Sequence, residues 1–394
     1  MRKCVCLALL ILVSITAPAN AAFGLSGGLG LSLINQELYL TTTVRPDISI
    51  GKLGIGLDLT LNFNQQGIRA ADWDSWQKSL ARSIRYVRWG HKGDSLYLQV
   101  GQLENASIGT GIIVSDYRNI NTQALKEGER RIGFVGDLDL QYIGVETLVN
   151  DVVQPSVYAV RFFTHPTAFL PDNAFDKLTI GISMAQDTRS EAPYNELNMK
   201  AVDAYFPLAE PLRLYAHYAF ITDHGDGWGV GARGRLGLIS YLAELRQMDA
   251  DFVASPFSKK YEDHGIDWAN HPADGEATQG YLLGANLNLM NDDFVLGVKQ
   301  ELLSKGGVQR RSASLSVGGS FLRMFTGGRD ASLSATYAQE LIDPALGDAN
   351  GYLDAAARIS LFRGVYLNYS YKAVFPYDHS APQSTMTGGV SFEF

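Results

Sequence analysis

Apolar residues recur at every second position through most of the chain, in segments of about ten residues. In the last segment, Met386, Val390 and Phe392 share one face, whereas Ser391 and Glu393 share the other. Successive side chains of a β-strand point to opposite faces, so this period predicts strands with one apolar and one polar face. The same alternation is found at residues 55–63, 228–238, 332–337 and 365–372. Helical periodicity is limited to a short turn expected around residues 74–78.

About twenty such segments can be marked along the chain, and they predict an all-β protein. They begin near residues 23, 36, 48, 81, 94, 131, 140, 156, 177, 196, 211, 228, 240, 278, 293, 310, 330, 352, 364 and 385. A chain with many strands and few helices has to protect its sheet edges, and closure into a barrel removes them.

The links between segments are short at one end and long at the other, as in a transmembrane antiparallel up-and-down β-barrel. The tight links are Arg45-Pro46-Asp47, His91-Lys92-Gly93, Asn291-Asp292 and Arg363, and the long links are about residues 64–80, 104–130, 250–277, 341–351 and 375–384. Two links break this rule, a long one at 166–176 and a very short one at 34–35. One strand pair could therefore be misassigned, and the expected barrel has about 18 strands, within a range of 16–20.

A soluble β-fold alternates as well, but three features favour a membrane barrel. The predicted outward face is apolar on most strands, whereas a soluble barrel needs its apolar face inside. Aromatic residues such as Trp89, Tyr218 and Phe294 cluster near the segment ends, where aromatic girdles meet the headgroups. The sequence also stops at Phe394, within an alternating strand.

Residues 1–21 have the pattern of a secretory signal peptide. Arg2 and Lys3 precede an apolar run of about 11 residues, and Ala19-Asn20-Ala21 forms an A-x-A cleavage site. An uncleaved anchor is the alternative, but a membrane helix needs roughly 20 apolar residues. We expect residues 22–394 to form one barrel domain. Both cysteines precede residue 22, so no disulfide or thiolate metal site is expected in this domain.

Composition and charge narrow the class further. The chain of 394 residues is 46% hydrophobic and 19% charged, which is too apolar for a disordered protein. Its net charge is −8, and the segment after residue 21 carries 31 basic and 41 acidic residues. This acidity argues against nucleic-acid binding, which requires a basic face.

The C-terminal sequence Gly388-Gly389-Val390-Ser391-Phe392-Glu393-Phe394 resembles the targeting strand of bacterial outer-membrane β-barrel proteins. The resemblance covers about ten residues and is shared by many unrelated barrels. It implies recognition by the barrel-assembly machinery through Val390, Phe392 and Phe394, and insertion into the outer membrane. Outer-membrane lipid and lipopolysaccharide are then partners, and the oligomeric state is left open, including a homo-oligomer.

If the apolar faces point to lipid, the opposite positions line the lumen. The charged residues at those positions are Asp58, Arg213, His217, Arg233, Arg235, Glu244, Arg246, Lys299, Glu301, Asp354, Arg358 and Lys372. Charges on the lipid face of a barrel cost up to roughly 2–4 kcal/mol at the bilayer midplane, so their restriction to one face favours a wet interior. Barrels of 16 or more strands leave an aqueous channel unless something fills it.

Residues 104–130 are the expected constriction or lid. An apolar stretch that includes Ile112 and Ile113 is followed by the polar Asp116, Tyr117 and Arg118. A fully solvated loop gives no reason for the apolar stretch, so we expect it to fold into the lumen. Packing across the barrel mouth and an extra strand pair are the alternatives. The basic run Arg82, Arg85, Arg88, His91 and Lys92 is interpreted as strand and turn charges that face carboxylates, in preference to a cationic rim.

No catalytic residue, cofactor or metal site is predicted. None of the seven histidines lies in a recognisable nucleophile motif. Residues 250–277 carry carboxylates and imidazoles, but their spacing matches no metal-binding motif, so we expect a hydrated acidic loop, with divalent-cation binding as the alternative.

The sequence predicts a porin-like channel for passive diffusion of small hydrophilic solutes, with a mild anion preference. A plugged barrel with a structural, adhesive or ligand-uptake role is the second hypothesis, and an outer-membrane enzyme is the third.

Overall fold

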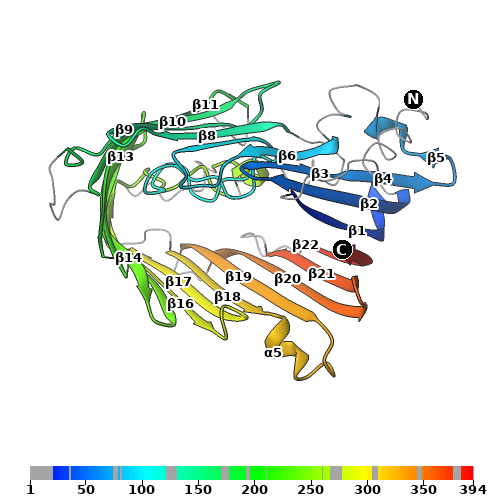
Figure 1. Ribbon diagram of the computed structural model, residues 1–394. Coiled ribbons are helices and arrows are strands. Elements are labelled where there is room, and N and C mark those ends of the chain that lie inside the picture. Colours follow the sequence, from blue (N-terminus) through cyan, green and yellow to red (C-terminus); the bar gives the residue numbers. More distant parts are fainter. Residues whose placement is uncertain are drawn as a thin grey trace.

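A computed structural model gives one antiparallel sheet that contains all the strands (Figure 1). It describes residues 21–34, 37–73, 79, 82–120, 131–169, 177–191, 196–209, 211–259, 261–266, 277–303, 309–343, 348–375 and 383–393. The strands are β1 (Ala21–Ile34), β2 (Glu37–Ile50), β3 (Leu53–Leu57), β4 (Leu59–Asn64), β5 (Gly67–Ile68), β6 (Ile84–Trp89), β7 (Leu96–Gly101), β8 (Gly133–Asp139), β9 (Ile143–Val149), β10 (Val157–Thr164), β11 (Thr179–Asp187), β12 (Leu197–Ala209), β13 (Leu212–Ile221), β14 (Gly225–Leu236), β15 (Ile239–Met248), β16 (Thr278–Leu289), β17 (Phe294–Leu303), β18 (Gln309–Val317), β19 (Ala331–Asp343), β20 (Asp348–Phe362), β21 (Val365–Phe375) and β22 (Gln383–Glu393).

The sheet closes on itself. From β6 to β22 each strand pairs with the next one along the chain. At the start of the chain β1 pairs with β2 and β3 pairs with β6, and Ser26–Gly30 of β1 pair with Gly389–Glu393 of β22. Both β3 and β4 pair with β2, so they are two halves of one barrel strand, and β5 pairs with β4. Within the described residues, the closed antiparallel barrel has 20 strands. The all-β barrel prediction is confirmed, and its central value of 18 strands is too low.

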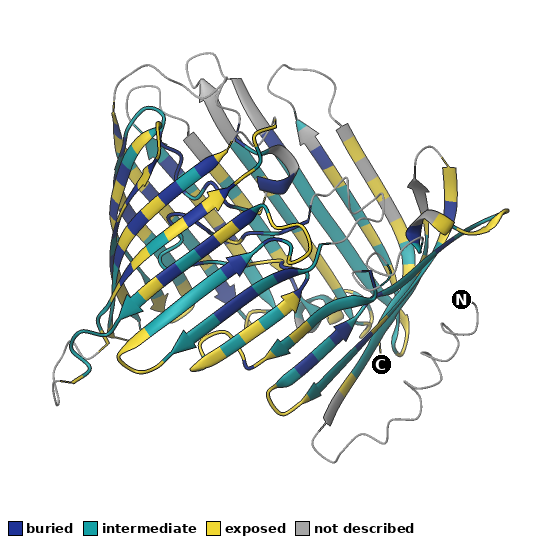
Figure 2. Cartoon of the chain, turned by 90° about the horizontal axis from the view of Figure 1, so that it is seen from above, coloured by how far each residue is buried: buried dark blue, intermediate teal, exposed yellow. Residues whose placement is uncertain are grey.

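The two faces of the barrel wall differ in chemistry, as Figure 2 shows by the alternation of buried and exposed residues along the strands. On β15, Glu244 and Arg246 are 5% and 7% exposed, whereas Leu245 between them is 62% exposed. The exterior is therefore apolar and the interior polar, which is the arrangement of a barrel that meets lipid. In the described part of the chain, no helix has the length and hydropathy to cross a membrane.

One predicted turn is wrong. Pro46 lies inside β2, opposite Leu25 of β1, and the chain turns instead at Gly51, which has φ +56°. On its other side, β2 pairs with β4 only as far as Val44 and resumes with β3 at Asp47. Proline has no backbone N–H to donate to a sheet, so it stands where this ladder is interrupted.

Short turns predominate at one end of the barrel and long loops at the other. Tight turns at Met290–Asp292 and Gly364 have positive φ values. Two longer links lie at the short-turn end. One joins β10 to β11, and the other joins β18 to β19 and contains the helix α5 (Gly319–Arg323). At the long-loop end are the 3-10 helix η1 (Ala70–Asp72) and α4 (Tyr261–His264). The helical turn expected around residues 74–78 lies outside the described residues.

Candidate functional site

Two long loops fold into the barrel and pack against each other. We call residues 102–120 the first inner loop, and residues 249–259 with 261–266 the second inner loop. Ser255 N–H donates to the Ile112 carbonyl at 2.7 Å, and Ser115 N–H donates to the Phe257 carbonyl at 3.0 Å. Figure 1 shows both loops inside the ring of strands. The first inner loop contains residues 104–120, which are the described part of the segment expected to form a constriction.

The loops and the barrel wall share one apolar core. It contains Ile112, Ile113 and Val114 of the first loop and Phe252 and Phe257 of the second. Their neighbours in the wall are inward-facing residues of β8 to β15, namely Val135, Leu148, Val157, Ala159, Ala185, Leu197, Met199, Ala201, Ala219, Ile221 and Met248. These strands are therefore apolar on both faces at the positions where the loops, and not water, cover their inner side.

A row of glycines on β14 makes room for this packing. A Cβ added to Gly227 would lie 2.7 Å from the Phe252 ring, and one added to Gly229 would lie 2.5 Å from His217 Nε2. A Cβ at Gly231 would lie 2.4 Å from the Tyr215 ring. Since glycine has no side chain, neighbouring side chains can cross this strand closely.

The tip of the first inner loop is attached to charged residues of the wall. Gly109 N–H donates to Glu146 Oε2 at 2.8 Å, and Thr110 Oγ1 lies 3.2 Å from His217 Nδ1. Beneath Gly109, Arg161 forms a two-pronged ion pair with Asp203, with N···O distances of 2.8 and 2.6 Å. Gly109 has φ +57°, and a Cβ there would lie 2.9 Å from Arg161, so glycine fits both the backbone and the contact.

A second ionic group follows along the same wall. Arg246 pairs with Glu244, with Nε at 2.8 Å, and also with Glu301. Tyr215 donates to Glu244 at 2.7 Å. Arg246, Glu244 and Glu301 are buried, so their opposite charges compensate each other away from water.

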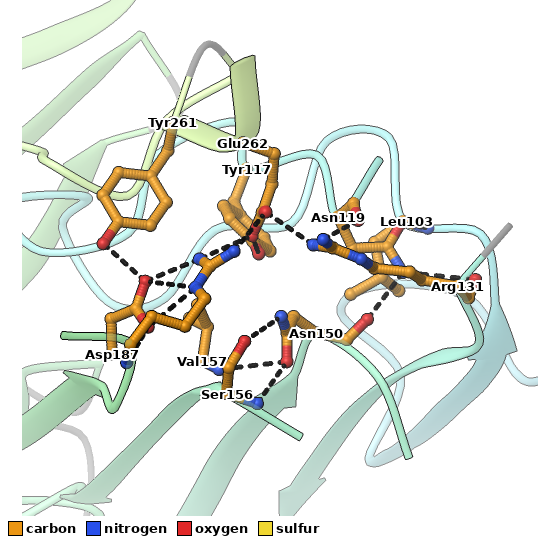
Figure 3. Close-up of polar contacts among 11 residues, drawn as sticks. Leu103, Tyr117, Asn119, Arg131, Asn150, Ser156, Val157, Asp187, Tyr261 and Glu262 are labelled. Atoms are coloured by element: carbon orange, nitrogen blue, oxygen red, sulfur yellow. Dashed lines mark hydrogen bonds and ion pairs between the residues drawn. The ribbon is translucent and has the colours of Figure 1, made fainter. Parts of the chain in front are cut away.

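A third polar cluster joins the two inner loops to the strand ends (Figure 3). Glu262 of the second loop accepts from Tyr117 of the first, from Arg131 at 2.5 Å and from Arg189 at 2.9 Å. Tyr261 donates to Asp187 at 2.7 Å. Because Glu262 is fully buried and doubly paired, the expectation of a hydrated acidic loop is wrong for this part of 250–277.

Burial and the neighbouring charged groups shift the pKa values of this cluster. Burial and the adjacent Glu262 carboxylate raise the pKa of Tyr117 well above its usual value. Burial and the Asp187 carboxylate likewise raise the pKa of Tyr261. Burial alone would lower the pKa of Arg189, but its hydrogen bonds to Asp187 and Glu262 raise it. At neutral pH, both tyrosines therefore keep their protons and Arg189 keeps its charge.

The opposite wall, from β20 to β22, has solvated charges. Asp354 and Lys372 lie 3.4 Å apart, and their side chains are 44% and 51% exposed. Arg161 and Asp203, beneath the first inner loop, are only 5% and 2% exposed. Arg358 pairs with Glu393 and stacks on the Tyr366 ring at 3.5 Å. Within the described residues, charges on one side of the interior are thus buried beneath the loops, whereas those on the other side are exposed.

Three of the expected lumen cations have no carboxylate partner in the described residues. Arg213 stands directly opposite Arg233 on the neighbouring strand. Arg233 lies over the rings of Tyr205 and Tyr215, at 5.4 and 5.6 Å. Lys299 is exposed on β17, opposite Gly284.

The remaining predicted site residues have these positions. Asp58 is buried and pairs with Arg45 at the break between β3 and β4. Arg235 pairs with Asp292 at the short-turn end, where both side chains are exposed. In the first inner loop, Ile112, Ile113 and Tyr117 are buried, Asp116 is exposed and Arg118 is half-buried. Val390 and Phe392 lie on β22, and Phe394 lies outside the described residues.

The pattern of the sequence did not reveal Glu146, Arg161 and Asp203. Their strands are apolar on both faces, so the alternation is blurred there. A usable signal was a single charge within an apolar strand, as in Val160-Arg161-Phe162 and Val202-Asp203-Ala204, because such a charge has to face inward. Glu262 and its arginines come from separate loops, and no spacing rule connects them.

Three residues of the basic run before the first inner loop form ion pairs, as expected for strand and turn charges. Arg82 pairs with Asp72, Arg85 with Asp47 and Lys92 with Asp137. Within the described residues, no group of three or more His, Cys, Asp or Glu is placed to hold a metal ion.

The fold and the interior together define the class of protein. The described residues form a closed 20-stranded antiparallel β-barrel with an apolar exterior and a polar interior partly filled by two loops, which is the architecture of outer-membrane barrels.

Comparisons with known proteins give similarity in shape only. No protein-family model and no curated protein sequence matches the chain. OccAB3 of Acinetobacter baumannii is 10% identical, with a TM-score of 0.39 over 95% of this chain and 98% of that one. OccK8 (OprE) of Pseudomonas aeruginosa is 9% identical, with a TM-score of 0.41 over 95% and 98%.

A third similar structure is Wzi, described as an outer membrane protein involved in group 1 capsule assembly in Escherichia coli and as a carbohydrate-binding β-barrel. It is 11% identical, with a TM-score of 0.39 over 95% of this chain and 84% of that one. At these TM-scores the similarity does not bear on function, which has to rest on the contacts of this chain.

Proposed function

We propose that this chain is an outer-membrane channel through which small hydrophilic solutes diffuse passively, past a constriction made by the two inner loops. The observation that carries the proposal is the asymmetry of the interior. Ion pairs beneath the loops are buried, whereas Asp354 and Lys372 on the opposite wall are about half exposed. Solvated charges on one wall are what a water-filled passage requires.

Passage in this channel is governed by size and charge. The first inner loop narrows the interior from the β8–β15 side, and the solvated wall supplies hydroxyl and charged groups along the route. Arg213, Arg233 and Lys299 have no carboxylate partner among the described residues. They favour anions mildly, because most other inward arginines are neutralised by carboxylates. The proposed mechanism contains no chemical step and no cofactor.

Planar-bilayer recording of purified protein tests the proposal directly. We expect discrete single-channel steps in potassium chloride, and a barrel without steps would contradict an open passage. The sharper test shortens the first inner loop. Ala106 and Tyr117 bond to each other through both backbone N–H groups, at 3.0 and 2.8 Å, so residues 108–115 can be replaced by Gly-Gly beyond this pair.

The shortened variant should have a several-fold larger conductance, because it removes Gly109, Thr110 and the apolar residues 112–114 from the interior. The matched control shortens the link between β9 and β10 by deleting the exposed Val152 and Val153. It should leave conductance unchanged.

A plugged barrel with a structural or ligand-uptake role is the second candidate. It is favoured by the continuous apolar core between both inner loops and the wall. In that case the intact barrel would give no steps, and only the variant without residues 108–115 would conduct.

The proposal also includes export of the chain and its insertion into the outer membrane. Residues 1–21 direct export and are removed, and Val390, Phe392 and Phe394 are read by the barrel-assembly machinery. The barrel then lies in the outer membrane, in contact with lipid and lipopolysaccharide. N-terminal sequencing of protein from outer-membrane fractions should begin at residue 22, and an intact Met1 would contradict the cleavage.

A further inference from the structure

The link between β18 and β19 carries the most exposed large apolar side chain among the described residues. Phe325 is 72% exposed and Met324 is 65% exposed, directly after helix α5. The link stands at the short-turn end, where neighbouring links such as the one at Gly364 need only about two residues. An exposed apolar pair on an unusually long link calls for a partner.

The position of α5 identifies which surface the pair extends. Phe321 of α5 contacts the ring of Phe294, with centroids 5.7 Å apart. Phe294 is paired with Val317 at the last step of the β17–β18 ladder, and it shares its face of β17 with the exposed Leu296 and Val298. Val317 is buried. Helix α5 therefore covers the outward face of the barrel, at the edge of its apolar surface.

The link holds Phe325 in a defined position. Its ring contacts that of Phe321, with centroids 5.3 Å apart. Thr326 donates to the carbonyls of Leu322 at 3.0 Å and Arg329 at 2.6 Å, and Gly328 N–H donates to the Arg323 carbonyl. Gly328 has φ +83°, a conformation that suits glycine. This surface is thus built into the fold.

Basic side chains border the apolar pair. Arg323 pairs with Asp330, with Nε at 2.6 Å, and both side chains are about half exposed. Arg329 is exposed and has no ion-pair partner among the described residues. Apolar side chains next to guanidinium groups complement the boundary between acyl chains and phosphate headgroups.

We propose that residues 318–330 form an interfacial membrane anchor. Met324 and Phe325 enter the acyl region of the leaflet at the short-turn end, and Arg329 contacts headgroup phosphates. A lipid leaflet is the occupant because the ring of Phe325 continues, through Phe321, the apolar exterior at Phe294. The inference rests on the proposed membrane location of the barrel.

Spin labels on single introduced cysteines test the anchor in lipid vesicles, with Cys4 and Cys6 replaced by Ser in the full chain. The test position is Phe325→Cys. Val298→Cys, on the outward face of β17, is the lipid reference, and Lys52→Cys, in the turn after β2, is the water reference. Collision rates with oxygen and with a water-soluble nickel chelate report the depth of each label.

We expect the label at 325 to collide with nickel several-fold less often than the label at 52. Nickel access equal to that at 52 would overturn the anchor, while a protected label at 298 would leave the membrane location intact. If the label at 298 is also in water, the proposed location fails. Dipolar broadening at 325 alone would indicate a second copy as the occupant, and would also overturn the proposal.

A separate variant tests the contact between Arg329 and the headgroup phosphates. In vesicles containing anionic phosphatidylglycerol, nickel access at 325 should be lower than in purely zwitterionic vesicles. Arg329→Gln should remove that difference, whereas Arg363→Gln, which alters an exposed arginine of another turn, should preserve it. A difference that persists in Arg329→Gln would overturn the role of this arginine.

Discussion

At the scale of single residues, charge pairing decides which polar side chains the barrel interior can bury. Glu262 is the clearest case, because it is fully buried and accepts from two arginines and a tyrosine. Taking a carboxylate out of water is costly unless such partners replace its hydration. The second inner loop thus gains a fixed point at the long-loop end of the barrel.

Replacing Glu262 with Gln should release this fixed point. Arg131 and Arg189 would lose the carboxylate that faces them, and breaking a buried ion pair costs about 3 kcal/mol or more. We expect a lower urea midpoint in detergent micelles together with noisier or larger channel currents. Asp292→Asn is the control, because its pair with Arg235 is exposed and contributes at most about 1 kcal/mol. Equal effects of the two substitutions would contradict the role of Glu262.

The tyrosines of the same cluster predict a response to alkaline pH. Burial, followed by the neighbouring carboxylates, raises the pKa of Tyr117 and of Tyr261 above the ordinary value near 10. A group with a raised folded-state pKa stabilises the fold fully below its unfolded pKa, and this stabilisation is lost as pH rises through the folded value. The contact between the inner loops should therefore weaken above about pH 10.

Currents recorded between pH 8 and pH 11 measure this effect. Wild-type conductance should rise at the alkaline end, because Tyr117 and Tyr261 ionise more easily once the loop contact has opened, and their ionisation then favours the open form. The double variant Tyr117→Phe/Tyr261→Phe should lose that rise, while Tyr158→Phe, at an exposed position, should keep it. A rise that survives in the double variant would rule out these tyrosines as its source.

At the scale of elements, the inner loops determine the composition of the strands they cover. Inward positions of β14 are glycine at 225, 227, 229 and 231, while Trp228 and Val230 face outward. The glycines form a shallow track across which Phe252, His217 and Tyr215 can lie. The loop and this strand therefore depend on each other.

Gly227→Ala tests this dependence. Its Cβ would lie 2.7 Å from the Phe252 ring, so the second inner loop has to shift, and overpacking of this kind costs about 1–3 kcal/mol. We expect faster proteolysis within the second inner loop. Gly284→Ala on β16 is the matched control, because its Cβ finds only ordinary contacts, the nearest at 3.4 Å from Leu242. Similar proteolysis of both variants would argue against loop packing on the glycine track.

The same dependence explains how far the sequence predicted the elements. All twenty marked segments correspond to barrel strands, because the alternation survives wherever one face meets lipid. The reduction to 18 came from two links that broke the length rule, and the long link between β10 and β11 is real. The turn at Pro46 was misplaced because a proline can also stand at a gap in a ladder.

The interior was less predictable than the strands. Inward positions such as Glu244, Arg246 and Glu301 follow from alternation, because their strands keep one polar face. Which charges are neutralised does not follow, since Arg161 meets Asp203 across strands 42 residues apart in the chain. The packing of the two loops on each other depends on contacts that no local pattern encodes.

At the scale of the whole molecule, the protein is acidic, yet the proposed passage prefers anions. An acidic protein can prefer anions because the pairing of charges inside the barrel, and not the net charge, sets the field in the passage. Arg161, Arg246 and Arg189 are held by carboxylates and contribute little net field, whereas Arg213, Arg233 and Lys299 have no carboxylate partner among the described residues. A few unpaired cations inside a low-dielectric wall act on a passing ion more strongly than many charges spread over the exterior.

Reversal potentials in a potassium chloride gradient test this argument. Wild-type channels should favour chloride mildly, and the triple variant Arg213→Gln/Arg233→Gln/Lys299→Gln should lose that preference or reverse it. A control that removes the same number of cations from exposed turns, Lys52→Gln/Lys177→Gln/Arg363→Gln, should keep the wild-type value, because those charges are screened by salt within about 10 Å at 0.1 M. Cation selectivity in the wild type would contradict the preference itself. Equal shifts in both triple variants would instead show that net charge, and not the position of the three cations, governs selectivity.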